Sequence, residues 1–334
     1  MLARAFDQAS CDDRAVIWGD FGVKHLLAAC CLLTAVSVSH AQTPKAPRAD
    51  SPAPELASVH AVVADFDTGA TLFAKRADTV VPIASLTKLM MAMVVLDAGQ
   101  PLDEWLKIVK RDGPIEKNAY SRLRIGSEAK RRDLLLIAVM SSENLACHVL
   151  AANYPGGTPA FVAAMNAKAS ELGMTETHFV DSSGLSPSNR STASDLVKMA
   201  NAAAHYSLIR ELSTTAEYTM SFRSPAYTLG YGNTNVLAHG DKWDIRLSKT
   251  GFINEAGRCL IMIATVGERV VTMVLLDSFG TRSPIGDANR VKRWLETGSS
   301  GTVAGAARDY ERQRTAATQV AVDAAPTRVS TGAP

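Results

Sequence analysis

Short apolar segments over residues 57–75 and 245–276 stand on either side of a middle region with longer apolar runs. Short apolar or alternating segments bounded by turn residues are typical of strands. They predict strands over residues 57–65, 72–75, 245–249, 258–266 and 270–276. Residues 100–190 are expected to be mainly helical and rich in loops, with a closing helix over 287–296. We therefore expect an α/β fold in which one sheet is built from both ends of the chain around a helical insertion.

Residues 82–96 are among the most apolar of the chain and predict a buried helix. The stretch has no Gly or Pro after Pro82 and is rich in Leu, Met and Ala, so the helix is apolar on nearly every side. Ser85 would lie at its start, where serine is favoured, and Lys88 follows three residues later on the same face. Burial lowers the pKa of a lysine. A neutral amine beside a hydroxyl is a general base beside a nucleophile.

Each half of this pattern also has an ordinary structural interpretation. A buried lysine can serve a structural carboxylate, and serine caps many helices. The same spacing recurs at Ser127 and Lys130, but there Arg131, Arg132 and Asp133 follow. We expect that second copy to lie on the surface, where nothing would lower the pKa of the lysine. The first copy alone therefore leaves the catalytic interpretation open.

Two further polar motifs follow along the chain. Ser142 and Asn144 stand between two apolar runs, at the junction of two predicted buried helices. Polar groups buried there need hydrogen-bond partners or a substrate, although both residues also cap helices well. The segment Lys249-Thr250-Gly251 ends a predicted strand, and its glycine would let a ligand backbone approach closely. A plain strand end followed by a turn could have the same sequence.

Together the three motifs indicate a penicilloyl-serine-transferase site. Ser-x-x-Lys, Ser-x-Asn and Lys-Thr-Gly form the set found in class A β-lactamases and penicillin-binding proteins. Beyond the motifs, the chain resembles the D-alanyl-D-alanine endopeptidases, low-molecular-mass penicillin-binding proteins of the D-Ala-D-Ala carboxypeptidase family. The resemblance covers about residues 56–297 and is carried by residues 82–90, 140–144, 153–157, 212–215, 233–235, 249–252 and 254–260. Leu145 departs from the pattern, where a basic residue would be expected, and we expect no effect on the chemistry.

The resemblance implies a fold and a set of site residues. The fold is an antiparallel sheet flanked by helices, with an all-helical subdomain and the site in the cleft between them. The implied catalytic residues are Ser85, Lys88 and Ser142. The implied substrate-binding residues are Asn144, Lys249, Thr250, Gly251 and Phe252. In this assignment Asn144 holds the substrate amide, and Thr250 with Lys249 holds the carboxylate at the leaving D-centre.

The same resemblance implies acyl transfer as the mechanism. Lys88 takes the proton of Ser85, which attacks the carbonyl of the penultimate D-Ala. Backbone N–H groups of Ser85 and Phe252 hold the oxyanion, and Ser142 with Lys249 relays a proton to the leaving amine. The implied partners are peptidoglycan peptide stems and cross-links together with β-lactam antibiotics, with no nucleic acid and no membrane anchor.

Three alternatives to an endopeptidase stay open. A β-lactamase shares the motifs but deacylates through a water held by a glutamate. Glu176 lies in a suitable stretch, but the expected downstream Asn is missing. A carboxypeptidase that releases only terminal D-Ala is the nearest rival, because both substrates carry a carboxylate at the leaving D-centre. A non-catalytic murein-binding protein is the third, and the complete set of motif residues argues against it.

Residues 1–41 predict a signal region and therefore a periplasmic protein. Basic residues at 24–25 precede the apolar stretch 26–38, and Ala41 ends a small-residue cleavage site. The apolar stretch is too short to span a bilayer as a retained helix. Acidic residues before Val23 are unusual ahead of a signal, so we infer that translation starts near Val23.

Composition adds several exclusions. The formal net charge is +2 with no Lys/Arg-rich face, which argues against nucleic acid, and the seven histidines lack ligand spacing, so we expect neither metal nor cofactor. Residues 42–55 are a Pro-rich linker. Residues 298–334 contain no Leu, Ile, Met, Phe or Trp, so we expect a disordered tail without a membrane anchor. Cys147 and Cys259 remain after processing; buried thiols are expected, and a disulfide stays open.

Overall fold

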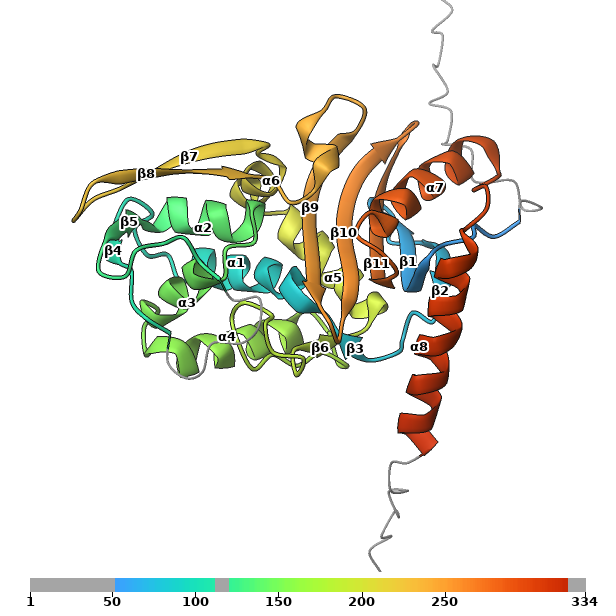
Figure 1. Cartoon of the computed structure of the whole chain (residues 1–334), viewed down its shortest axis with the longest axis horizontal. Helices are drawn as coiled ribbons and strands as arrows, with labels where there is room; N and C mark the ends of the chain where they lie inside the picture. The colour runs from blue at the N-terminus through green and yellow to red at the C-terminus, as the bar shows by residue number, and fades with distance from the viewer. Residues whose placement is uncertain (1–51, 112–119, 324–334) are drawn as a thin grey trace, which may run out of the picture. The chain divides into compact units, whose positions relative to one another are not determined.

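The computed structural model describes residues 52–111 and 120–323. An antiparallel five-stranded sheet has the order β2-β1-β11-β10-β9 (Figure 1). Its strands are β1 (Ser58–Asp65), β2 (Thr71–Lys75), β9 (Asp244–Ile253), β10 (Gly257–Val266) and β11 (Arg269–Ser278). Each predicted strand is confirmed, and β1 pairs directly with β11, as expected for a sheet built from both ends of the chain. The predicted signal region, the start near Val23 and residues 42–51 of the predicted linker lie outside the described residues.

Helices and short strand pairs make up the rest of the described chain. The α-helices are α1 (Thr87–Asp97), α2 (Arg131–Met140), α3 (Asn144–Ala152), α4 (Gly157–Glu171), α5 (Ala193–Ala204), α6 (Ser207–Thr214), α7 (Ser283–Thr297) and α8 (Gly305–Asp323). Two 3₁₀ turns are η1 (Ala84–Leu86) and η2 (Val236–His239). The two-stranded pairs are β3 (Val81–Pro82) with β6 (Arg190–Ser191), β4 (Trp105–Lys107) with β5 (Glu128–Lys130), and β7 (Glu217–Phe222) with β8 (Tyr227–Gly232). A separate helical subdomain over residues 100–190 stays a prediction.

Helices cover both faces of the sheet because its central strands are apolar on both sides. On β1, Val62 packs into a core shared with the helices of the middle of the chain, whereas its neighbour Val63 packs into a core shared with α7. α5 contacts one face of the sheet and α7 the other (Figure 1). Complete burial of each such side chain stabilises the fold by roughly 1.5–3 kcal/mol. The sheet is therefore a rigid support for residues that project from β9.

Helix α1 lies inside the larger core, as its all-round apolar sequence predicts. Every residue from Thr87 to Val95 is buried. The helix contacts α2, α3, α4 and α5. Lys88, in the first turn of α1, is therefore carried into the protein interior, with none of its surface exposed.

The C-terminal tail differs from the sequence prediction. Disorder was expected from residue 298, and this was wrong for residues 305–323, which form α8. The helix is held by charged side chains: Glu311 pairs with Lys75 and Arg76 at 2.9 and 2.6 Å, and Arg314 pairs with Asp277 at 2.6 Å. Because α8 is held by ion pairs, the scarcity of large apolar residues in the tail could not predict that this helix packs against the sheet domain. Among the described helices, none is both long and apolar enough to cross a membrane.

The start of β1 is tied to α7 by one buried carboxylate, which gives a stability prediction. Asp287 is fully buried and accepts hydrogen bonds from Ala57 N at 2.9 Å, Ser58 N at 2.7 Å and Ser58 Oγ at 2.6 Å. In Asp287→Asn an amide would face these donors, so we expect a loss of about 2–4 kcal/mol in the free energy of unfolding. Urea denaturation measures it. The control Asp309→Asn, at an exposed i,i+3 pair, should change stability little. Equal losses in both variants would contradict this assignment.

Candidate active site

The structure brings Ser85 and Lys88 together at the N-terminus of a buried helix. Ser85 lies in η1 and Lys88 in the first turn of α1, and Lys88 Nζ is 2.7 Å from Ser85 Oγ. Ser85 was predicted to lie at the start of α1, but this helix begins at Thr87 and Ser85 belongs to the preceding η1. Neither η1 nor α1 has a side-chain cap hydrogen bond at its start. The serine hydroxyl is half-buried and turned toward the lysine amine. The predicted nucleophile and base are thus in direct hydrogen-bond contact.

The Lys88 amine has two further partners from distant parts of the chain. It donates to Asn144 Oδ1 at 2.7 Å and to the Ser183 carbonyl oxygen at 2.7 Å. Burial lowers the pKa of Lys88 below its ordinary value. A lysine with a purely structural role would be expected to pair with a carboxylate, but each hydrogen-bond acceptor of this amine is neutral. The site therefore favours an uncharged amine, as a general base requires.

A second hydroxyl and amine face the same space. Lys249 Nζ, on β9, donates to Ser142 Oγ at 3.0 Å and to the Thr250 carbonyl oxygen at 2.8 Å. Burial, and next the charge of Lys88, hold the pKa of Lys249 well below its ordinary value. Ser142 has a φ of 64°, in the left-handed region that costs a non-glycine residue roughly 1–2 kcal/mol. The turn before α3 thus accepts backbone strain that fixes where the Ser142 hydroxyl points.

β9 passes close to η1 at Gly251, where an added side chain would crowd its neighbours. A Cβ added to Gly251 would lie 3.2 Å from Ser85 N and 3.3 Å from the Ile83 carbonyl oxygen. Beside it, Thr250 Oγ1 donates to Thr234 Oγ1 at 2.6 Å, and Phe252 is 38% exposed. The close approach places the backbone that leads into Phe252 beside the backbone of Ser85.

These residues line one cavity of about 560 Å³. Its lining includes the predicted site residues Ser85, Ser142, Asn144, Thr250, Gly251 and Phe252. The two lysines are absent from the lining, because their amines lie beneath the hydroxyls that they contact. The geometry therefore presents two hydroxyls to a ligand and keeps two amines behind them, an arrangement suited to proton transfer to and from the hydroxyls.

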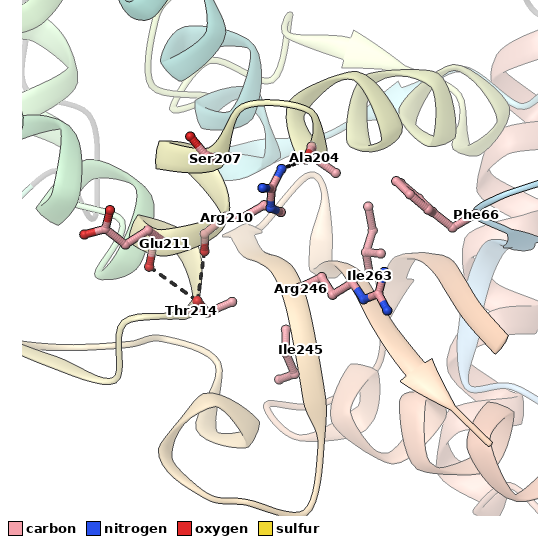
Figure 2. Close-up of a pocket in the computed structure, with 9 residues that line it drawn as sticks. All are labelled: Phe66, Ala204, Ser207, Arg210, Glu211, Thr214, Ile245, Arg246 and Ile263. Carbon is pink, nitrogen blue, oxygen red and sulfur yellow. Dashed lines mark hydrogen bonds between the residues drawn. The ribbon is translucent and has the colours of Figure 1, made fainter. Parts of the chain in front are cut away.

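A second cavity of similar volume carries different chemistry. Figure 2 shows it between α6 and β9, with Arg210 and Arg246 pointing toward it beside Phe66 and Ile263. Two dashed bonds run from Thr214 Oγ1 to backbone carbonyl oxygens of its own helix, and another runs from the Arg210 guanidinium to the Ala204 carbonyl oxygen. None of the predicted site residues lines this cavity.

The sequence-based interpretation of the second Ser-x-x-Lys copy needs correction. Ser127, expected on the surface, is buried and donates to the Arg124 carbonyl oxygen at 2.7 Å. Lys130 belongs to β5, so the three-residue spacing does not bring the two side chains onto one helix face. Glu176, the residue considered for holding a β-lactamase water, is exposed and lines neither the cavity that contains Ser85 nor the one lined by His148 and Asp181.

The sequence analysis missed the loop that supplies Ser183. A backbone carbonyl oxygen carries no residue signature, so no motif could have revealed this contact with Lys88. Asn189 also escaped notice: its Nδ2 donates to Thr87 Oγ1 at 3.1 Å and so ties the loop to α1. Its Oδ1 accepts from Val180 N at 2.7 Å. Both the oxygen and the nitrogen of the Asn189 side-chain amide make hydrogen bonds that hold the loop. The sequence alone cannot show this, because the partners are backbone atoms and a distant threonine.

Cys147 and Cys259, the two cysteines among the described residues, are buried free thiols. Cys147 Sγ, on α3, donates to the carbonyl oxygen of Glu143, the residue just before that helix, at 3.3 Å. Burial raises the pKa of Cys147 to about 11 and that of Cys259 to about 12. Neither thiol is therefore a nucleophile near neutral pH. In the described part of the chain, no three His, Cys, Asp or Glu side chains are grouped so that they could hold a metal ion.

Comparisons with known proteins identify the family to which the chain is similar. A family model described as D-alanyl-D-alanine carboxypeptidase matches residues 45–280. The chain is 52% identical over 260 residues to the D-alanyl-D-alanine endopeptidase of Pseudomonas aeruginosa, covering 78% of this chain and 84% of that protein. It is 49% identical over 263 residues to the Escherichia coli D-alanyl-D-alanine endopeptidase, covering 79% and 85%.

Solved structures place the fold in the same group. The crystal structure of the DD-transpeptidase of Streptomyces strain K15 is similar with a TM-score of 0.67 at 29% identity, covering 78% of this chain and 99% of that one. Penicillin-binding protein D2 of Listeria monocytogenes in its cefotaxime-bound form is similar with a TM-score of 0.63 at 29% identity, covering 74% and 99%. The resemblance and the fold expected from the sequence are confirmed, and the chain belongs to the D-alanyl-D-alanine carboxypeptidase family of serine peptidases.

Proposed function

We propose that the chain is a serine DD-peptidase that hydrolyses D-alanyl cross-links of peptidoglycan through an acyl-enzyme at Ser85. The contact that carries the proposal is the 2.7 Å pair of Ser85 Oγ and Lys88 Nζ, at a cavity that also presents Ser142. Family membership and two relatives named as endopeptidases support the peptide substrate. The signal-like N-terminal sequence supports export to the periplasm.

Acylation begins with proton transfer from Ser85 Oγ to the neutral Lys88 amine. The oxygen then attacks the D-Ala carbonyl carbon, and the carbonyl oxygen becomes an oxyanion. Backbone N–H groups of Ser85 and Phe252 are the proposed donors to that oxyanion, and the contact at Gly251 brings their two segments together. In other enzymes, removal of one such donor costs ~2.7–4 kcal/mol.

Collapse of this intermediate breaks the bond between the carbonyl carbon and the leaving nitrogen. The nitrogen needs a proton, and Ser142 Oγ, held 3.0 Å from Lys249 Nζ, is placed to deliver it. The proton that Lys88 took from Ser85 then replaces the one given by Ser142, so both groups regain their starting protonation. Asn144 would hold the substrate amide, and Thr250 with Lys249 would hold the carboxylate of the leaving D-centre. A water molecule then attacks the ester at Ser85, and the serine regains its proton as the acid leaves.

Penicillin would follow the first half of this path and stop at the ester. Its ring amide takes the place of the cleaved peptide bond, and the opened ring stays attached to the acyl group. The exposed position of Glu176 gives no support to rapid deacylation of the β-lactamase kind. A long-lived covalent adduct is therefore the expected product with β-lactam antibiotics.

The choice between endopeptidase and carboxypeptidase can be tested with two purified substrates. The mature protein is incubated with a cross-linked muropeptide dimer and, separately, with a monomer that ends in D-Ala-D-Ala. We expect faster cleavage of the dimer to monomers, read by liquid chromatography and mass spectrometry. Faster release of D-Ala from the monomer would instead assign a carboxypeptidase, and cleavage of neither would contradict the proposed activity.

A further inference from the structure

The loop that contacts Lys88 is organised by a single carboxylate. Asp181 Oδ1 accepts hydrogen bonds from Ser183 N at 2.6 Å, Ser183 Oγ at 2.9 Å and Gly184 N at 2.6 Å. Its other oxygen, Oδ2, accepts from Ser186 N at 2.8 Å. Three of these donors are backbone N–H groups, so the carboxylate fixes the path of the main chain and not only of one side chain.

The same loop is pressed against the segment that carries the nucleophile. A Cβ added to Gly184, at a φ of +81°, would lie 1.9 Å from the Ala84 carbonyl oxygen. Asn189 Nδ2 donates to the Asp181 carbonyl oxygen at 2.9 Å and to Thr87 Oγ1 at 3.1 Å. The loop is thus fixed against both η1 and α1. These contacts give the Ser183 carbonyl oxygen a defined position relative to Lys88.

The geometry of a neutral amine explains why this position matters. A neutral lysine amine has two N–H bonds and one lone pair in a tetrahedral arrangement. Asn144 Oδ1 and the Ser183 carbonyl oxygen accept from Lys88 but have no hydrogen to give, so each occupies one N–H bond. The remaining direction, toward Ser85 Oγ, is then left to the lone pair. Without the Ser183 acceptor, an N–H bond could point at Ser85, and the amine could not take the serine proton.

We propose that Asp181 is a positioning residue for acylation, which fixes the Ser183 carbonyl oxygen so that the Lys88 lone pair points at Ser85 Oγ. This inference rests on the proposed role of Lys88 as the base. Asp181 touches neither Ser85 nor Lys88 directly in the hydrogen bonds of the described residues, and it acts through the backbone of its own loop.

The negative charge of Asp181 should also affect how the acylation rate depends on pH. The ionisable groups that act on the Lys88 amine are Cys147 on α3, Asp181 in its loop, Glu143 before α3, Arg111, and Lys249 on β9. Burial lowers the pKa of Lys88, and Asp181 and Glu143 oppose it. Removal of the Asp181 charge therefore lowers the pKa of Lys88 further. The rise of the acylation rate with pH should shift to lower pH, although the maximal rate falls because the amine is misdirected.

The experiment compares two substitutions at one position. In Asp181→Asn the charge is lost and the Ser186 N–H faces an amide; in Asp181→Glu the charge stays but the longer side chain cannot keep the same contacts. The rate of penicillin adduct formation is followed by intact mass over a range of pH. We expect both variants to lose about 10²-fold in maximal rate. The midpoint of the pH profile should move lower in Asp181→Asn and much less in Asp181→Glu.

Asp65→Asn is the matched control. Asp65 also accepts a backbone N–H and a hydroxyl from one residue, Thr68 N at 2.9 Å and Thr68 Oγ1 at 2.8 Å, in the turn between β1 and β2. It should acylate like the wild type, with an unchanged midpoint. Circular dichroism on every variant corrects the rates for the folded fraction, and Asp181→Glu serves if Asp181→Asn does not fold.

Two results would overturn the inference alone. Wild-type rates in both Asp181 variants would show that the loop needs no carboxylate to hold Ser183. A rate loss explained by the folded fraction, with an unchanged midpoint, would reduce Asp181 to a purely structural role. If the wild-type protein forms no adduct at Ser85, the proposed function itself is wrong and the inference is lost with it.

Discussion

Ser85→Ala will fold normally and form no covalent adduct with penicillin. The hydroxyl is half-buried, and Lys88 keeps its contacts with Asn144 Oδ1 and the Ser183 carbonyl oxygen when it is removed, so stability should change little. Without the oxygen no acyl-enzyme can form. Peptidase activity should fall by about 10⁴-fold or more, as for other serine enzymes stripped of the nucleophile.

Intact mass of the purified protein, with and without penicillin, measures this result. Ser127→Ala is the matched control, because Ser127 has the same three-residue spacing to a lysine and its hydroxyl contacts Tyr227 Oη at 3.0 Å. The control should gain the mass of one penicillin, like the wild type. An adduct on Ser85→Ala would move the nucleophile elsewhere, and consumption of penicillin by the wild type without a lasting adduct would indicate a β-lactamase.

Lys88→Met should slow acylation by about 10²–10⁴-fold, the range that general acid–base catalysis contributes. The thioether fills the buried volume but accepts no proton at neutral pH. In the wild type, the neutral amine is the base, so the rate should rise with pH through the lowered pKa of Lys88 and then level off. The variant should lose that rise. Lys130→Met, at a half-exposed lysine beside Trp105, is the control and should keep it.

Stability should respond to the same titration. Lysine in the unfolded chain has its ordinary pKa near ~10.4, whereas burial lowers the pKa of Lys88 in the folded protein. Between the two values the unfolded chain binds more protons, so wild-type stability rises with pH over that window. Lys88→Met lacks this contribution, and its stability relative to the wild type should be best at neutral pH and decline toward pH ~10. A pH-independent difference in urea denaturation would argue that Lys88 is not neutralised by burial.

Much of the fold and most of the site residues could be predicted from sequence, for reasons that differ between elements. The strands of the sheet and α1 could be predicted because buried strands and helices require apolar runs of characteristic length and spacing in the sequence. Ser85, Lys88, Ser142 and Lys249 were recognised because three motifs occur together, although no periodicity could say that β9 would meet η1. That meeting depends on tertiary packing through Gly251.

The features that escaped prediction share a physical cause. The Ser183 carbonyl oxygen is a backbone atom, and its use by Lys88 leaves no mark on residue identity. α8 docks through Glu311 and Arg314, and charged residues look the same in a docked helix and in a disordered tail. The burial of Ser127 was missed because the charged residues that follow it suggested solvent. In each case the decisive contact comes from residues distant in sequence.

The five-stranded sheet combines β1 and β2 with β9, β10 and β11, which lie far away in the sequence. This separation affects when during folding the site can form. Ser85 and Lys88 are three positions apart, but Ser142 and Lys249 are 107 apart, and the Ser58–Ser278 contact that joins β1 to β11 spans 220. Such high contact order makes sheet closure a slow, late step of folding. While the N-terminal part emerges first during synthesis, its serine has neither β9 nor Lys249 beside it. The hydrolase therefore becomes competent only after β9 to β11 have joined the N-terminal strands in the folded sheet.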